Sequence, residues 1–286
     1  MVGPSLRELA IAHGTDKEGA HHYTDHYERH LGHLRDRPIT LLEIGIGGYD
    51  DPAAGGGSLR MWNAYFPRAR IIGVDLHDKQ PLAEGRIEIL QGDQSDPAFL
   101  ADLGATRGPF DVVIDDGSHI NAHVITTFTG LFPHMAPGGI YAIEDLQTSY
   151  WERGYGGSSG ADRSATSMTF LQRLVDGLNY AELDVAGYEP TATDLGITGI
   201  AFYHNLAVIQ CGRNDEPSNF LRPHPRPAAV YAVPPRRTPA TPRATARGNP
   251  AVHSARSAAR AVLPAPLRRR LRAALERVRH VTRRRP

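Results

Sequence analysis

Five apolar segments of β type alternate with segments of helical pattern, and this alternation constrains the fold more than any other feature of the chain. We expect strands at 40–46, 70–75, 87–91, 111–115 and 140–144, then a hairpin of 200–204 and 206–210 that turns at Asn205. Helical patterns occupy 5–13, 23–34, 58–66, 97–103, 122–135 and 166–178. Strands that alternate with helices form a parallel, doubly wound sheet. The sequence therefore predicts an α/β fold with a late antiparallel hairpin.

Charge divides the chain into two unlike parts. Residues 1–221 hold 15 basic and 30 acidic residues, whereas the remainder holds 17 arginines, no lysine and one acid, Glu276. The basic part is rich in Pro, Ala and Thr, and it has too little apolar surface to offset the entropy lost on ordering. We predict a helical segment at 1–38, a folded domain at 39–221 and a basic tail at 222–286 that is disordered over 222–262.

The end of the tail has a helical pattern of its own. Apolar residues recur at helical spacing from Leu267 to Val281, between clusters of arginine. We predict an amphipathic helix at 265–281 that contacts an anionic membrane. Two other interpretations stay open. The tail can fold back on the acidic part of its own chain, or it can bind nucleic acid, although the lack of interleaved aromatic residues argues against the latter.

The cellular compartment is indicated by the scarcity of cysteine and by the absence of membrane-span and signal-peptide patterns. The single cysteine, Cys211, excludes an intramolecular disulfide and a cysteine-rich zinc site. No stretch is long and apolar enough for a membrane span, and residues 1–12 lack the pattern of a signal peptide. We expect a cytoplasmic protein, which the tail can hold at the inner membrane surface.

Two acidic clusters lie at the ends of two neighbouring predicted strands. Asp115 and Asp116 end one strand, and Glu144 and Asp145 end the next. The carboxyl ends of parallel strands meet at one edge of the sheet, where ligands bind in such folds. Asp116, Glu144 and Asp145 together suit Mg²⁺, which prefers oxygen ligands and keeps positions open for a substrate. Asp115 is expected to support the loop, because adjacent strand residues point to opposite faces.

The first three strands end in residues that suit an adenosine-bearing ligand. A Gly-rich turn follows Glu43, Asp75 is placed to bind ribose hydroxyls, and Asp93 and Gln94 suit an adenine edge. A plain tight turn and helix caps are the alternative interpretations. The acidic pair Asp50-Asp51 after the turn repels a pyrophosphate, so S-adenosylmethionine is favoured over a nicotinamide dinucleotide, with Glu43 near its amino-acid portion.

Six motifs together resemble the metal-dependent sugar O-methyltransferases of macrolide biosynthesis, the mycinamicin and macrocin type. They are HGTDK at 13–17, HYT at 22–24, EIGIGGY at 43–49, GGSLRMW at 56–62, DDGSH at 115–119 and IEDLQTSY at 143–150. The resemblance covers residues 8–215 and implies a class I methyltransferase fold, with S-adenosylmethionine and Mg²⁺ as cofactors. It implies Asp116, Glu144 and Asp145 as metal ligands and His119 as the catalytic histidine. Further cofactor-binding candidates are Thr15, Gly45, Tyr49, Ser58 and Asp116.

These residues predict methyl transfer to a sugar hydroxyl of a glycosylated natural product. A divalent ion lowers the pKa of a hydroxyl that it binds, and His119, three residues after Asp116, is placed to take the proton. A cephalosporin-hydroxylase-like enzyme and a catalytically silent adaptor, recruited by its tail, are the alternatives. The sequence leaves open the sugar, the hydroxyl position, the aglycone and assembly into a homo-oligomer.

Overall fold

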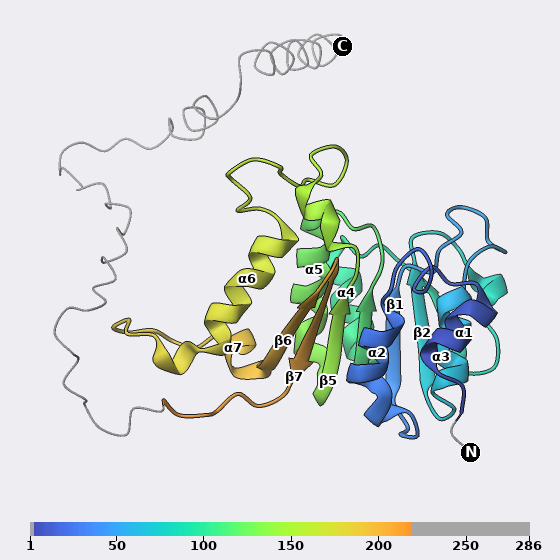
Figure 1. Ribbon diagram of the computed structural model, residues 1–286, viewed down its shortest axis with the longest axis horizontal. Helices are drawn as coiled ribbons and strands as arrows, with labels where there is room; N and C mark the ends of the chain where they lie inside the picture. The colour runs from blue at the N-terminus through green and yellow to red at the C-terminus, as the bar shows by residue number, and fades with distance from the viewer. Residues whose placement is uncertain (1–2, 219–286) are drawn as a thin grey trace, which may run out of the picture. The chain divides into compact units, whose positions relative to one another are not determined.

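The computed structural model describes residues 3–218 and contains a seven-stranded sheet in the order β3-β2-β1-β4-β5-β7-β6 (Figure 1). The strands are β1 (Thr40–Ile44), β2 (Arg70–Asp75), β3 (Ile87–Gln91), β4 (Phe110–Asp115), β5 (Met135–Ile143), β6 (Ile197–Tyr203) and β7 (Leu206–Cys211). The first five are parallel where they pair, whereas β7 is antiparallel to β5 and β6. This arrangement confirms the class I methyltransferase fold with its late hairpin.

Helices cover both faces of the sheet. They are α1 (Leu6–His13), α2 (Thr24–Leu31), α3 (Gly57–Tyr65), α4 (Pro97–Arg107), α5 (Asn121–Leu131), α6 (Ser167–Leu178) and α7 (Ala192–Gly196). Successive strand residues face opposite layers: Leu41 and Val112 pack in the core with α1, α2 and α3, and Leu42 and Val113 in the core with α4, α5 and α6. Period-two alternation of this kind buries both faces of a central strand.

Strand β5 begins earlier than its sequence predicts. The sequence predicts a strand from Ile140, but β5 starts at Met135. Phe110 pairs with Met135 and Val112 with Ile140, so the register shifts between these two pairs. The extra residues form a bulge, and Gly138 has a φ of 81°. A glycine inside a strand is typical of such a bulge.

The N-terminal segment shares the core of the sheet domain. Ser5 and Glu8 form a capping box at the start of α1. Tyr27 of α2 and Trp62 of α3 lie in one buried cluster, with their ring centroids 5.2 Å apart. The segment 14–23, which joins α1 to α2, reaches the carboxyl ends of β1, β4 and β5. It thereby supplies side chains to the predicted site.

The predicted basic tail at 222–286 and its amphipathic helix at 265–281 lie outside the described residues. The boundaries that we placed between 38 and 39 and between 221 and 222 stay predictions. Among the helices of residues 3–218, none combines the length and the apolar character needed to cross a membrane.

Candidate functional site

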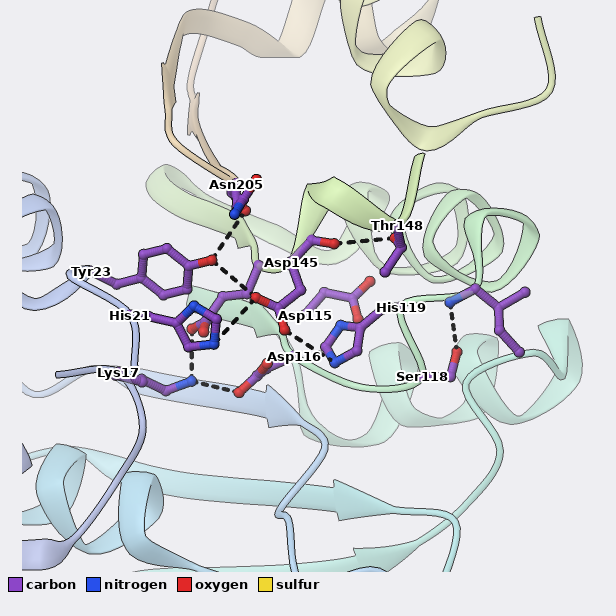
Figure 2. Close-up of polar contacts among 12 residues, drawn as sticks. Lys17, His21, Tyr23, Asp115, Asp116, Ser118, His119, Asp145, Thr148 and Asn205 are labelled. Carbon is purple, nitrogen blue, oxygen red and sulfur yellow. Dashed lines mark hydrogen bonds and ion pairs between the residues drawn. The ribbon is translucent and has the colours of Figure 1, made fainter. Parts of the chain in front are cut away.

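A buried lysine gathers acidic side chains at the carboxyl edge of the sheet. The Nζ atom of Lys17 lies 2.7 Å from Asp116 Oδ2 (Figure 2). It also lies 2.7 Å from Glu144 Oε1 and 3.2 Å from Glu43 Oε1. Asp116 and Glu144 directly follow β4 and β5, and Glu43 is the penultimate residue of β1. The Lys17 side chain is 0% exposed. One ammonium group therefore joins three strand ends to the N-terminal segment.

Burial and charge determine protonation in this group. Burial alone lowers the pKa of Lys17, but the three carboxylates outweigh this effect and raise it well above its ordinary value. Burial raises the pKa of Glu43 to about 7, against the opposing effect of Lys17. Burial also raises the pKa of Glu144, and the neighbouring Asp116 adds to the shift. The cluster thus contains a permanent ammonium and acids whose ionisation is costly, an arrangement that favours further cations nearby.

Asp116 also belongs to a second, more open cluster. Ligand atoms of Asp116, His119 and Asp145 all lie within 4.8 Å of one another. His119 Nε2 is 3.6 Å from Asp145 Oδ2, and these two side chains are 21% and 17% exposed. Both residues have a left-handed backbone with a φ of 54°, which is uncommon for residues other than glycine and clusters at functional sites. The two acidic clusters of the sequence therefore converge at this edge.

The N-terminal segment also contacts Asp145. The Tyr23 hydroxyl donates a hydrogen bond to Asp145 Oδ1 at 3.0 Å, and His21 Nε2 lies 3.6 Å from the same oxygen (Figure 2). The His21 and Tyr23 rings stack with their centroids 4.7 Å apart. One oxygen of Asp145 thus lies beside His21 and Tyr23, and the other beside His119.

The three predicted metal ligands lie at two depths. Asp116 and Asp145 are 21% and 17% exposed, whereas the Glu144 side chain is 2% exposed. Glu144 Oε1 accepts hydrogen bonds from Lys17 and from the Tyr27 hydroxyl, the latter at 2.6 Å. The contacts of Asp116 and Glu144 with described side chains fall on a single oxygen of each carboxylate. The remaining oxygens and Asp145 are hard donors that suit Mg²⁺, so the residues fit this ion.

The Gly-rich turn after β1 packs on the loop that carries Asp116. Gly45 has a φ of 90°, and a Cβ atom there would lie 2.2 Å from the carbonyl oxygen of Asp116. Only glycine allows this approach. Tyr49 is 88% exposed with a φ of 49°, and Ser58 is buried in the first turn of α3. The turn therefore brings the expected cofactor loop against the expected metal loop.

Asp75 lies at the end of β2 and is bonded to that turn. Its Oδ2 accepts a hydrogen bond from the backbone N–H of Ile46 at 3.0 Å, and its Oδ1 accepts one from His77 at 2.9 Å. In the described chain no α-helix begins there, and the next helical turn starts at Gln80. The carboxylate is half-buried and lies at the switch region where such folds bind ribose.

The two candidate cofactor-binding residues that follow β3 differ in exposure. Asp93 is exposed, and its Oδ1 accepts hydrogen bonds from the Ser95 backbone N–H and hydroxyl, each at 2.7 Å. Gln94 is 7% exposed and its side-chain amide is engaged inside the protein. It donates to Asp115 Oδ1 at 3.1 Å and accepts from the Ser118 N–H at 2.6 Å. The Gln94 side chain thus links the end of β3 to the DDGSH loop.

Sequence reasoning gave no role to Lys17 or Tyr27. One signal was available, because the whole chain contains only two lysines, Lys17 and Lys79, among 32 basic residues. Both lysines are 0% exposed. A chain that otherwise uses arginine places lysine where a compact ammonium with three donors is needed. Thr15, which is half-buried, lies in the same segment, and its Oγ1 accepts from the Lys17 N–H at 3.5 Å.

The chain is similar in sequence to known sugar O-methyltransferases. An 8-demethyl-8-alpha-L-rhamnosyl tetracenomycin-C 2'-O-methyltransferase of Streptomyces olivaceus is 53% identical over 208 residues, which are 72% of this chain and 54% of that protein. The mycinamicin VI 2''-O-methyltransferase of Micromonospora griseorubida is 48% identical over 216 residues, covering 74% of this chain and 54% of the relative. No protein-family model matches the chain.

A solved structure agrees with these relatives. The methyltransferase MycE of the mycinamycin biosynthetic pathway, in complex with Mg and SAH, is 46% identical with a TM-score of 0.75, over 78% of this chain and 58% of that one. The chain spans about half the length of the curated relatives that it matches. The resemblance seen in the sequence is confirmed: over the matched residues this chain is a homologue of the sugar O-methyltransferases of macrolide and polyketide pathways.

Proposed function

We propose that the protein transfers a methyl group from S-adenosylmethionine to a sugar hydroxyl of a glycosylated natural product, with Mg²⁺ as cofactor. The observation that carries the proposal is the convergence of Asp116, His119 and Asp145 within 4.8 Å, beside the Gly-rich turn of a methyltransferase sheet. Relatives at 53% and 48% identity are named as methyltransferases that act on a rhamnosyl tetracenomycin and on mycinamicin VI. This similarity favours a methyltransferase over the hydroxylase-like and adaptor alternatives.

The acids of the site would hold the ion. Asp116 and Asp145 present oxygens at the open face, and Glu144 lies beneath them. Mg²⁺ bound there supplies positive charge that lowers the pKa of a substrate hydroxyl. Because Glu144 lies beneath Asp116 and Asp145, the outer coordination positions of the ion would stay free for the sugar hydroxyl.

His119 would act as the general base. Its imidazole is partly exposed and belongs to the same cluster as Asp116 and Asp145. Asp145 Oδ2, at 3.6 Å from Nε2, stabilises the imidazolium that forms when His119 takes the hydroxyl proton. His21 lies across Asp145 from His119 and is a second imidazole at the substrate side.

The cofactor would lie along the ends of β1, β2 and β3. Asp75 would bind the ribose, and Asp93 the adenine side, while Thr15, Tyr49 and Ser58 lie around the turn. S-adenosylmethionine supplies the methyl group, so these residues chiefly set its position relative to the acceptor oxygen. Glu43 and Gln94 are buried. Glu43 forms an ion pair with Lys17, and Gln94 accepts a hydrogen bond from the DDGSH loop, so both would support the cofactor site from inside the fold.

An assay of methyl transfer tests the proposal. The purified full-length chain is incubated with labelled S-adenosylmethionine, Mg²⁺ and a panel of rhamnosylated and deoxysugar macrolides and polyketides, with the matching aglycones as controls. We expect label in glycosides and none in aglycones. Methylation of the aglycones alone would contradict the sugar specificity, and no transfer to any acceptor by a protein that binds the cofactor would favour the adaptor.

A further inference from the structure

The buried ammonium of Lys17 has no role in the chemistry proposed above, yet it contacts the acids on which that chemistry depends. Its Nζ atom is 2.7 Å from Asp116 Oδ2 and 2.7 Å from Glu144 Oε1. The third carboxylate, Glu43, lies at 3.2 Å. Lys17 therefore joins two of the three predicted metal ligands without belonging to the strands that carry them.

Each of these contacts engages one oxygen of a carboxylate. Lys17 occupies Oδ2 of Asp116, and Lys17 and Tyr27 together occupy Oε1 of Glu144. A carboxylate with one oxygen fixed cannot rotate freely, so the direction of its other oxygen is set. Partners that fix metal ligands in this way tune the affinity of the site, and their loss weakens metal binding by roughly 10- to 100-fold.

We propose that Lys17 is a positioning residue of the metal site: its ammonium orients Asp116 and Glu144 toward a divalent ion. The inference rests on the proposed function, because it presupposes that these acids bind the ion. Lys17 repels the ion by its charge but orients the ligands of the ion by its contacts. The structure favours the second effect, because the Lys17 side chain is 0% exposed whereas Asp116, which it contacts, is 21% exposed, so the ammonium lies deeper than the open face of the site. Positioning therefore predicts weaker metal binding when Lys17 is removed, and simple charge competition predicts tighter binding.

The residue type is also informative. A lysine ammonium is a compact point charge with three donors, and three carboxylates surround this one. Arginine, with its planar fork, is the basic residue that this chain uses at all but two positions. The other lysine, Lys79, is equally buried but donates to the backbone carbonyls of Asp51 and Ala54, at 2.6 and 3.1 Å. Lys79 thus provides a matched control.

The test measures the binding of Mn²⁺, as a probe for the divalent ion, by electron paramagnetic resonance on the full chain. We expect Lys17→Met to weaken Mn²⁺ binding roughly 10- to 100-fold and to raise the Mg²⁺ concentration needed for half-maximal activity by a similar factor. Lys79→Met should bind Mn²⁺ within a few-fold of the wild type, although it loses two buried hydrogen bonds. Equal or tighter Mn²⁺ binding by folded Lys17→Met would overturn the proposal.

A second variant covers a failure to fold. Lys17→Met leaves Glu43 and Glu144 buried without a counter-charge, whereas Lys17→Met combined with Glu43→Gln restores the net charge of the buried group. The double variant should still bind Mn²⁺ more weakly, because Asp116 and Glu144 remain unfixed. Failure of both variants to fold would make Lys17 a residue of stability alone and would overturn the proposal. A wild type that binds no Mn²⁺ would instead contradict the metal site of the proposed function.

Discussion

The Nε2 atom of His119 lies 3.6 Å from Oδ2 of Asp145, and both residues have the same left-handed backbone, with a φ of 54°. His119 follows β4 and Asp145 follows β5, so each leaves its strand through a conformation that costs about 1 kcal/mol or more. Two such residues in contact at the carboxyl edge indicate that the surrounding structure maintains a specific arrangement of an acid and a base.

Replacement of His119 by alanine should affect chemistry and not binding. We expect kcat to fall about 10²- to 10⁴-fold, the usual effect of losing a positioned general base. Binding of S-adenosylmethionine, measured by calorimetry, should stay near the wild-type value. His22→Ala is the matched control, since the His22 side chain is 81% exposed. A His119→Ala enzyme within a few-fold of the wild-type rate would reject the assignment.

Asp75→Ala should weaken cofactor binding. The loss of charge-assisted hydrogen bonds to a ribose is expected to cost about 1.5–3 kcal/mol for each bond, which titration calorimetry resolves. Because Asp75 also accepts from the Ile46 N–H, Asp75→Asn serves as a comparison that preserves part of this contact. An unchanged dissociation constant in Asp75→Ala would leave Asp75 with a structural role only.

Glu43 should make stability depend on pH. Burial raises its pKa to about 7 from an ordinary value of 4.5, so the folded state binds the proton more tightly than the unfolded state. Stability contributed by protonated Glu43 is therefore complete below 4.5 and is lost as the pH rises toward 7. Glu43→Gln should lose less stability than the wild type between pH 5 and pH 8 in metal-free urea unfolding. Parallel pH profiles for the two proteins would contradict the expected shift.

Removal of the chain after Leu221 should leave the chemistry intact. The proposed catalytic groups all precede residue 150, and β7 ends at Cys211. We expect an unchanged kcat on a soluble glycoside and a loss of binding to anionic vesicles, because the removed part carries 17 arginines. Equal vesicle binding by the full and shortened chains would rule out membrane contact through the tail.

The alternation of strands with helices and the acidic edge were predictable, because β-type runs, glycines and acids follow one another locally along the chain. The position of Lys17 was not, since it depends on how the segment 14–23 crosses the ends of three strands. The contacts of Gln94 were not predictable for a related reason: its polarity suggested an adenine edge, and its amide bonds to Asp115 and Ser118 inside the fold. Sequence pattern places a residue at an edge, whereas tertiary packing decides which way its side chain faces.

The proposed chemistry depends most directly on a divalent ion at Asp116 and Asp145. The decisive measurement is turnover of a rhamnosylated acceptor with labelled S-adenosylmethionine, first in excess chelator and then after stepwise addition of Mg²⁺, for the wild type and Asp116→Asn. We predict no turnover in chelator, full recovery with Mg²⁺ in the wild type, and little recovery in folded Asp116→Asn. Full turnover of the wild type in excess chelator would contradict the account.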